Sequence, residues 1–250
     1  MTHRPTTILL VHGSWHGGWA FDGIAERLRG EGHEPHAPCL AGLGNDAHNL
    51  APSTGFTHHV GQLRRLVEWH DWQDFVLVGH SYGGALAHAL ETAVAGRLRA
   101  VVHLEGAITL PGQSIMESWP EERREGVRRQ LAEGDGWRVP PPDPESWGGL
   151  SEAQIHWLRA KLTDQAVSSY TEAMPEDAGG FAGPHYYLVA NDRDPQPYQS
   201  VVDRFIDEPN WQIATTVGGH ELMFTAVEAV MATIRAAIAR ATLPDSFPSA

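Results

Sequence analysis

The chain reads FVLVGHSYGG from Phe75 to Gly84, so an apolar run passes directly into a serine framed by glycines. The four apolar residues at the start are typical of a buried strand. GHSYG, at residues 79–83, matches the pattern Gly-x-Ser-x-Gly, in which the serine lies on a strained turn between a strand and a helix. Apolar residues then recur at helical spacing: Leu86, Ala89, Leu90, Ala93 and Val94. The stretch therefore predicts a strand, a sharp turn at Ser81 and a helix.

The pentapeptide alone is a weak signal, because a chain with 26 glycines can contain it by accident. The strand before it and the helix after it are the context that the motif requires. Glycines at the flanking positions have a steric reason, since a side chain there would collide with the neighbouring strand or helix. We therefore interpret Ser81 as a nucleophile on such a turn.

Further short apolar runs alternate with amphipathic helical segments on both sides of this stretch. The predicted strands are 7–11, 33–37, 75–78, 100–104, 186–190 and 212–217. This alternation predicts an α/β fold with a mostly parallel central sheet and helices on both faces. Residues 106–180 lack clear strand patterns and carry several Pro and Gly breaks. We expect one core made of residues 1–105 and 181–250, with residues 106–180 inserted as a small helical cap.

A serine hydroxyl needs a base to take its proton during attack. Of the 15 histidines, His220 follows the last predicted strand, in the loop where a base of this fold belongs, and two glycines precede it. A carboxylate must then orient the imidazole. Asp192, just past the strand 186–190, is the first choice, followed by Glu105 and then Asp194. The order serine, acid, histidine along the chain agrees with the motif.

The negative charge of a tetrahedral intermediate is usually stabilised by backbone amides. One amide should belong to Tyr82, and the other to Ser14 in the loop after the first strand. We see no spacing typical of a metal site and no phosphate-binding or dinucleotide-binding motif, so the sequence predicts neither a metal nor a cofactor.

Four segments carry a family resemblance: HGSWHGGW at 12–19, GHSYGG at 79–84, PGQS at 111–114 and GHEL at 219–222. They resemble the α/β-hydrolase superfamily, and within it the plant methylesterase and hydroxynitrile lyase group with its bacterial esterase relatives. The resemblance implies a small cap and cofactor-free chemistry on esters or cyanohydrins. In the plant lyases a threonine and a lysine stand where this chain has Gly13 and Glu221. A carboxylate would repel leaving cyanide, so ester hydrolysis is favoured.

The substrate is expected to be a small to medium hydrophobic ester or lactone, bound at His12 and Gly13 of the first loop and by cap aromatics. Most large apolar cap residues should pack on the core, and the rest should line a pocket. The cap residues chosen as pocket walls are Trp119, Trp137 and Trp157. A lyase using the same triad, and a ligand-binding receptor on a hydrolase fold, remain open as alternatives.

The net charge of −13 disfavours nucleic acid as a partner, and the arginines between 123 and 129 are interpreted as a solvated helix face. A single cysteine excludes an intramolecular disulfide, and the polar start does not resemble a signal peptide. No apolar run reaches the roughly 20 residues that span a bilayer. We expect a cytoplasmic protein that acts on a small molecule, with a homodimer left open.

Overall fold

The computed structural model describes residues 4–247 and places six strands in one sheet, in the order β2-β1-β3-β4-β7-β8. All neighbouring strands of this sheet are parallel. The six strands are β1 (Thr7–Val11), β2 (Glu34–His36), β3 (Phe75–His80), β4 (Leu98–Leu104), β7 (His185–Ala190) and β8 (Trp211–Thr216). Each lies within one or two residues of a strand expected from the sequence.

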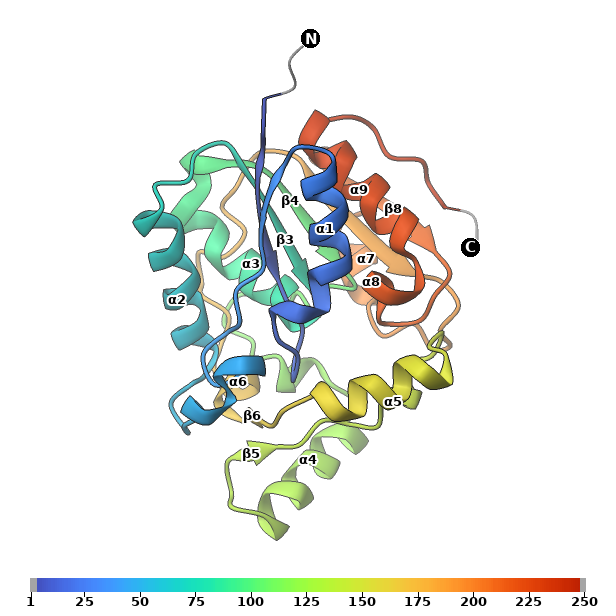
Figure 1. Cartoon of the computed structure of the whole chain (residues 1–250). Coiled ribbons are helices and arrows are strands. Elements are labelled where there is room, and N and C mark those ends of the chain that lie inside the picture. Colours follow the sequence, from blue (N-terminus) through green and yellow to red (C-terminus); the bar gives the residue numbers. More distant parts are fainter. Residues whose placement is uncertain (1–3, 248–250) are drawn as a thin grey trace.

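Helices cover both faces of the sheet (Figure 1). The α-helices are α1 (Asp22–Gly30), α2 (Phe56–Trp69), α3 (Tyr82–Val94), α4 (Glu121–Glu133), α5 (Glu152–Lys161), α6 (Ser168–Thr171), α7 (Gln199–Phe205), α8 (Leu222–Thr225) and α9 (Val227–Ala239). Short 3-10 helices are Gly18–Phe21, Gly44–Asn49, Ala95–Arg97, Met116–Ser118 and Pro144–Trp147.

The core follows from the two-residue period of the strands. Leu77 of β3 faces α2 and α3 in one buried cluster, whereas its neighbours Val76 and Val78 face α1 and α9 in another. All three side chains are fully buried. Because both faces of each central strand are covered, these strands read as continuous apolar runs rather than as an alternating pattern.

The segment between β4 and β7 lies over the end of the sheet where the strands terminate, as Figure 1 shows for α4, α5 and α6. It also contains two short antiparallel strands, β5 (Arg138–Val139) and β6 (Gln165–Ala166), which the sequence did not predict. Gln165 accepts a hydrogen bond from the backbone N–H of Trp15, at 2.8 Å. The insertion is therefore tied to the loop that follows β1.

Within residues 4–247, none of the helices has the length and apolar character that a bilayer crossing requires.

The close approach of α3 to β1 gives a stability prediction. A Cβ at Gly83 would lie 2.2 Å from the carbonyl oxygen of Val11, whereas a Cβ at Gly96 would meet nothing within 4 Å. We expect Gly83→Ala to lower the free energy of unfolding by at least about 1–3 kcal/mol, because backbone must move. Gly96→Ala, the matched control, should be neutral or stabilise by about 0.4–1 kcal/mol. Urea denaturation of both variants measures the difference, and equal stabilities would contradict the steric argument.

Candidate active site

Ser81 occupies the turn between β3 and α3 in a strained conformation, with φ 52° and ψ −117°. Residues other than glycine rarely adopt a backbone conformation with positive φ. The turn requires glycine at position 79, because a Cβ at Gly79 would lie 2.3 Å from the carbonyl oxygen of Gly83. Ser81 is also held by its backbone N–H, which donates to Leu104 of the neighbouring strand at 3.0 Å. The structure thus has the sharp turn that the sequence predicted at this serine.

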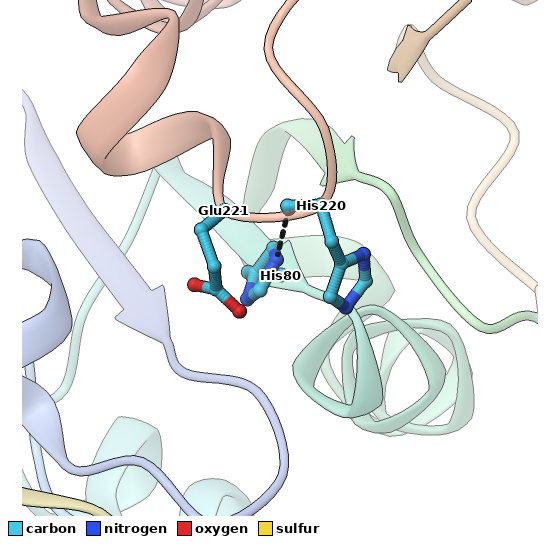
Figure 2. Close-up of side chains that lie close together, drawn as sticks. All are labelled: His80, His220 and Glu221. Carbon is cyan, nitrogen blue, oxygen red and sulfur yellow. Dashed lines mark hydrogen bonds between the residues drawn. The ribbon is translucent and has the colours of Figure 1, made fainter. Parts of the chain in front are cut away.

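His80, the residue before the serine, positions the loop that follows β8. Its Nε2–H donates to the backbone carbonyl of His220 at 3.0 Å, as Figure 2 shows. The same loop contacts the segment between β4 and β7, because the backbone N–H of His220 donates to the carbonyl of Trp147 at 2.9 Å. Gly219 has a φ of 69°, and a Cβ there would lie 2.4 Å from the carbonyl oxygen of Gly148. His220 is therefore held by His80, which precedes the turn at Ser81, and by Trp147 of the segment between β4 and β7.

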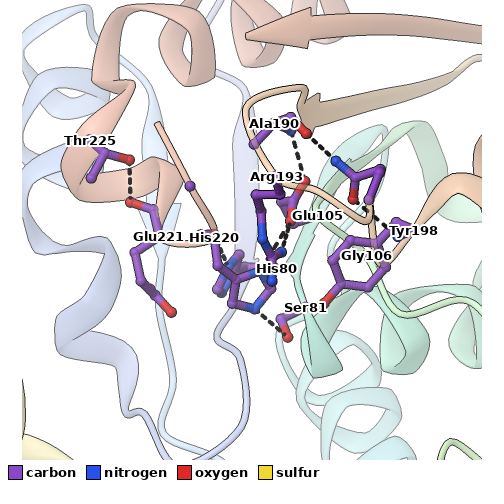
Figure 3. Close-up of polar contacts among 12 residues, drawn as sticks. His80, Ser81, Glu105, Gly106, Ala190, Arg193, Tyr198, His220, Glu221 and Thr225 are labelled. Atoms are coloured by element: carbon purple, nitrogen blue, oxygen red, sulfur yellow. Dashed lines mark hydrogen bonds and ion pairs between the residues drawn. The ribbon is translucent and has the colours of Figure 1, made fainter. Parts of the chain in front are cut away.

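The imidazole of His220 lies between a serine and a glutamate (Figure 3). Its Nε2 is 3.0 Å from Ser81 Oγ, and its Nδ1 is 3.2 Å from Glu105 Oε2. An ionised carboxylate only accepts hydrogen bonds, so Nδ1 carries the proton and Nε2 presents its lone pair to the serine. This is the tautomer that a general base requires.

Glu105 is fully buried at the end of β4, with a φ of 49°. Its Oε1 accepts from the backbone N–H of Ala190 at 2.7 Å, and its Oε2 accepts from Arg193 Nη1 at 2.7 Å as well as from His220. A buried carboxylate is costly unless it is paired and hydrogen-bonded, and these three donors meet that need. The left-handed backbone turns the side chain from the strand end toward the histidine.

Asp192, the first choice for the acid, does not contact the imidazole of His220 in the structure. It is exposed, and its carboxylate accepts hydrogen bonds from the backbone N–H groups of Gly218, at 3.0 Å, and Gly219, at 3.2 Å. These bonds support the glycine turn before His220 rather than the imidazole itself. Asp194 is also exposed. The second-ranked candidate, Glu105, is the carboxylate that contacts His220.

A cavity of about 570 Å³ opens at Ser81. Ser14 and Tyr82, expected to supply the amides of an oxyanion hole, both line it, and so does Trp119 from the insertion. The backbone N–H of Tyr82 begins α3, where the helix dipole favours negative charge. The rest of the lining is mixed. Its apolar side chains include Ala107, Ile108, Ile115 and Val201, and its polar ones include Ser118, Arg123, Gln196, Tyr198 and Ser200.

A smaller chamber of about 100 Å³ shares Ser14 and Ser81 with this cavity and is much more polar. Its walls include His16, His80, His220 and Glu221. Burial disfavours the charged form of Glu221, but nearby His16 outweighs this effect, and the pKa of the carboxyl is lowered to about 2. Burial also lowers the pKa of His80 to about 3, so this imidazole is neutral at pH 7.

The remaining predicted substrate contacts are not brought to the cavity. His12 is fully buried, with Nδ1–H donating to Gly13 and Nε2 accepting from the N–H of Leu40, so both nitrogens are used within the fold. Trp137 stacks with Arg138, and Trp157 packs edge-on against Trp19. None of these three side chains lines the chambers at Ser81.

Gly13, in the loop after β1, and Arg123, in α4, are placed differently from what the sequence led us to expect. A Cβ at Gly13 would lie 2.8 Å from His80 Nδ1 and 3.2 Å from Ser81 Cβ, so this glycine lets the loop approach the serine without itself lining the cavity. Arg123, assigned to a solvated helix face, instead lines both chambers and lies over the ring of Trp119 at 4.0 Å. No sequence signal separates it from the other arginines of α4.

Comparison with known proteins agrees with this arrangement. The model of the alpha/beta hydrolase family matches residues 8–233. A carbendazim hydrolyzing esterase of Nocardioides sp. (strain SG-4G) is 27% identical over 223 residues, which are 86% of this chain and 92% of that protein. Methylesterase 10 of Arabidopsis thaliana is 36% identical over 77 residues, 30% of this chain and 28% of the plant protein.

Among solved structures, an extracellular alpha/beta-hydrolase from a Paenibacillus species matches with a TM-score of 0.79 and 20% identity, covering 96% of this chain and all of that one. It is described as sharing structural and functional homology with tobacco salicylic acid binding protein 2. The resemblance to the plant methylesterase-like group and the expected fold are both confirmed. A family model that spans most of the sequence and a neighbour with the same sheet agree with the turn at Ser81, so this chain belongs to the alpha/beta hydrolase family.

Proposed function

We propose that the protein is a serine esterase that cleaves a carboxylic ester or lactone of a small to medium hydrophobic substrate through an acyl-enzyme on Ser81. The observation that carries the proposal is the continuous chain of contacts from Ser81 Oγ through His220 to Glu105, with steps of 3.0 and 3.2 Å. Relatives named as esterases support the same class of reaction. The sequence and the site offer this chemistry without a cofactor.

In the proposed mechanism, Ser81 Oγ attacks the ester carbonyl while His220 Nε2 takes its proton. Glu105 stabilises the imidazolium through the Nδ1–H bond. The backbone N–H groups of Ser14 and Tyr82 would hold the oxyanion, and each such donor contributes about 3 kcal/mol to the transition state. The alcohol then leaves with the proton from His220. Water, activated by the same imidazole, hydrolyses the acyl-enzyme.

The apolar part of the cavity lining supports a hydrophobic acyl or alcohol group. Trp119 and Ile115 come from the segment between β4 and β7, so residues 106–180 would act as a cap that supplies much of the substrate wall. Burying an apolar group against such walls gains about 25 cal/mol per Å² removed from water. The substrate is therefore recognised mainly by fit and burial, and the polar groups near Ser81 act on the ester itself.

A cyanohydrin lyase fits the site less well. Glu221, beside the proposed base, is fully buried and its lowered pKa keeps it ionised at pH 7. A buried carboxylate would repel the cyanide anion that such a reaction releases. A receptor without turnover is disfavoured by the serine and histidine contact, because a binding site has no need of an oriented base.

The first test is covalent labelling with an organophosphonate, paired with hydrolysis of p-nitrophenyl esters of increasing acyl length. Wild type should be labelled once and should hydrolyse the esters. Ser81→Ala should fold normally by circular dichroism, resist labelling, and lose about 10⁴-fold or more in kcat. Undiminished turnover by Ser81→Ala, or no labelling of folded wild type, would contradict the proposal.

The second test separates the two acids. In Glu105→Gln the amide cannot hold the Nδ1–H tautomer in the same way, so we expect kcat to fall about 10⁴-fold with KM little changed. Asp192→Asn, the matched control, should lose far less activity, because Asp192 contacts the backbone of Gly218 and Gly219 rather than the imidazole. Steady-state kinetics of both variants measures the two losses of kcat. A larger loss in Asp192→Asn than in Glu105→Gln would indicate that Asp192 is the acid.

A further inference from the structure

The small chamber beside Ser81 is lined by Arg123 and Arg193 and also holds three polar atoms of Glu221 and His80 without a hydrogen bond to any described residue. Within the part of the chain that the structure describes, neither carboxylate oxygen of Glu221 accepts a hydrogen bond, and His80 Nδ1 has no hydrogen-bond partner. Glu221 and His80 are both fully buried. A buried polar group without a hydrogen-bond partner is destabilising, so several of them at one place indicate that a ligand could bind there.

The hydrogen bonds of the neighbouring atoms fix which nitrogens carry protons. His80 Nε2 faces the carbonyl oxygen of His220 at 3.0 Å, and a carbonyl only accepts, so Nε2 is protonated and Nδ1 holds a lone pair. His220 Nδ1 donates to Glu105, so His220 Nε2 also holds a lone pair. With the carboxylate of Glu221, the chamber offers two imidazole nitrogens and one carboxylate as electron-pair donors, near the guanidinium groups of Arg123 and Arg193.

One ligand atom from each of His80, His220 and Glu221 lies within 4.8 Å of the other two, and Figure 2 shows the three side chains grouped beneath one loop. Two imidazole nitrogens and a carboxylate are ligands that Zn²⁺ prefers, and three protein ligands leave a fourth position for a small molecule. The sequence gives no sign of this set, because His80 lies far along the chain from the other two residues.

A further histidine holds the carboxylate in place. His16 Nδ1 faces the carbonyl oxygen of Ser14 at 2.6 Å and must therefore carry a proton, while its Nε2 is 3.4 Å from Glu221 Oε2. This contact positions the carboxylate of Glu221, as residues around metal ligands commonly do.

We propose that His80, His220 and Glu221 form an inhibitory Zn²⁺ site that uses the catalytic histidine as a ligand. Bound zinc occupies the lone pair of His220 Nε2, so this nitrogen no longer accepts the proton of Ser81. Inhibition is reversible, because removal of the metal by a chelator restores the lone pair. The inference of inhibition rests on the proposed esterase function, whereas the binding of the metal does not.

A second buried group provides the internal control. Glu91 of α3 lies 3.2 Å from His88 Nδ1 and 3.1 Å from His185 Nε2, and His103 Nε2 is 3.7 Å away. Ligand atoms of His88, Glu91 and His103 also lie within 4.8 Å of one another. Here, however, the carboxylate has hydrogen-bond partners on both oxygens. This group lines neither chamber at Ser81, so zinc bound to it would not occupy His220.

The experiment begins with binding, measured on chelator-treated Ser81→Ala by calorimetric titration with ZnCl₂ in a buffer that does not bind metal. This variant keeps all three ligands and needs no activity. We expect one site whose affinity falls at least about tenfold in Ser81→Ala/Glu221→Gln. Glu91→Gln in the same background should leave this site unchanged. If Glu221→Gln does not fold, His80→Gln replaces it, because the glutamine amide imitates the Nε2 donor and removes the Nδ1 ligand.

The second part measures ester hydrolysis and phosphonate labelling by wild type with increasing ZnCl₂, followed by excess chelator. Both should be inhibited and then restored, and Glu91→Gln should be inhibited as wild type is. Zinc that binds nowhere, or binding lost in Glu91→Gln but kept in Glu221→Gln, would overturn the site. Zinc binding that depends on Glu221 in a protein without esterase activity would instead overturn the proposed function and leave the metal site standing.

Discussion

The strained backbone at Ser81 is the constraint on which the rest of the site depends. The turn between β3 and α3 exists because Gly79 and Gly83 allow contacts that a Cβ would forbid, with Gly83 packed against Val11 of β1. The packing of the sheet and of α3 therefore holds a conformation that costs about 1–3 kcal/mol by itself. As a result, Ser81 Oγ lies 3.0 Å from His220 Nε2, and the N-terminus of α3, whose dipole favours negative charge, begins directly after Ser81.

The histidine is positioned by several weak contacts instead of one strong one. His80 holds the carbonyl of His220, Asp192 holds the amides of the two preceding glycines, and Trp147 accepts from the N–H of His220. Glu105 then sets its tautomer. Each of these residues comes from a different part of the chain, so the orientation of one imidazole depends on the correct packing of the sheet, the loop after β7 and the insertion. This distribution is typical of sites in which a rigid scaffold carries functional loops.

Much of this could be predicted from the sequence because the signals are local. The strands at 75–80 and 185–190, the turn at Ser81 and the place of His220 follow from apolar runs and glycines. Which carboxylate contacts His220 could not be predicted, because Glu105 and Asp192 both follow strands, and β4 and β7 are direct neighbours in the sheet. Only the left-handed backbone of Glu105 separates them, and it has no sequence signature. The contact of Glu221 with His16 and the position of Arg123 at the two chambers also join residues far apart in the sequence, so local patterns could not predict them.

The position of Glu105, directly after β4, has a consequence for how this protein could diversify. The segment after β7 contributes Pro195, Gln196, Pro197 and Tyr198 to the wall of the large cavity, but none of these four residues supplies the carboxylate that faces His220. The proposed relay from Ser81 through His220 ends at a residue next to a central strand, whereas this wall belongs to the loop after β7. Tyr198 is the exception among the four, because its ring stacks on the imidazole of His220 at 5.8 Å between centroids. Substitutions at Pro195, Gln196 and Pro197 can therefore change the shape of the pocket without removing a side chain that contacts His220. Natural variation or directed evolution at these three positions can alter which ligands the cavity accepts.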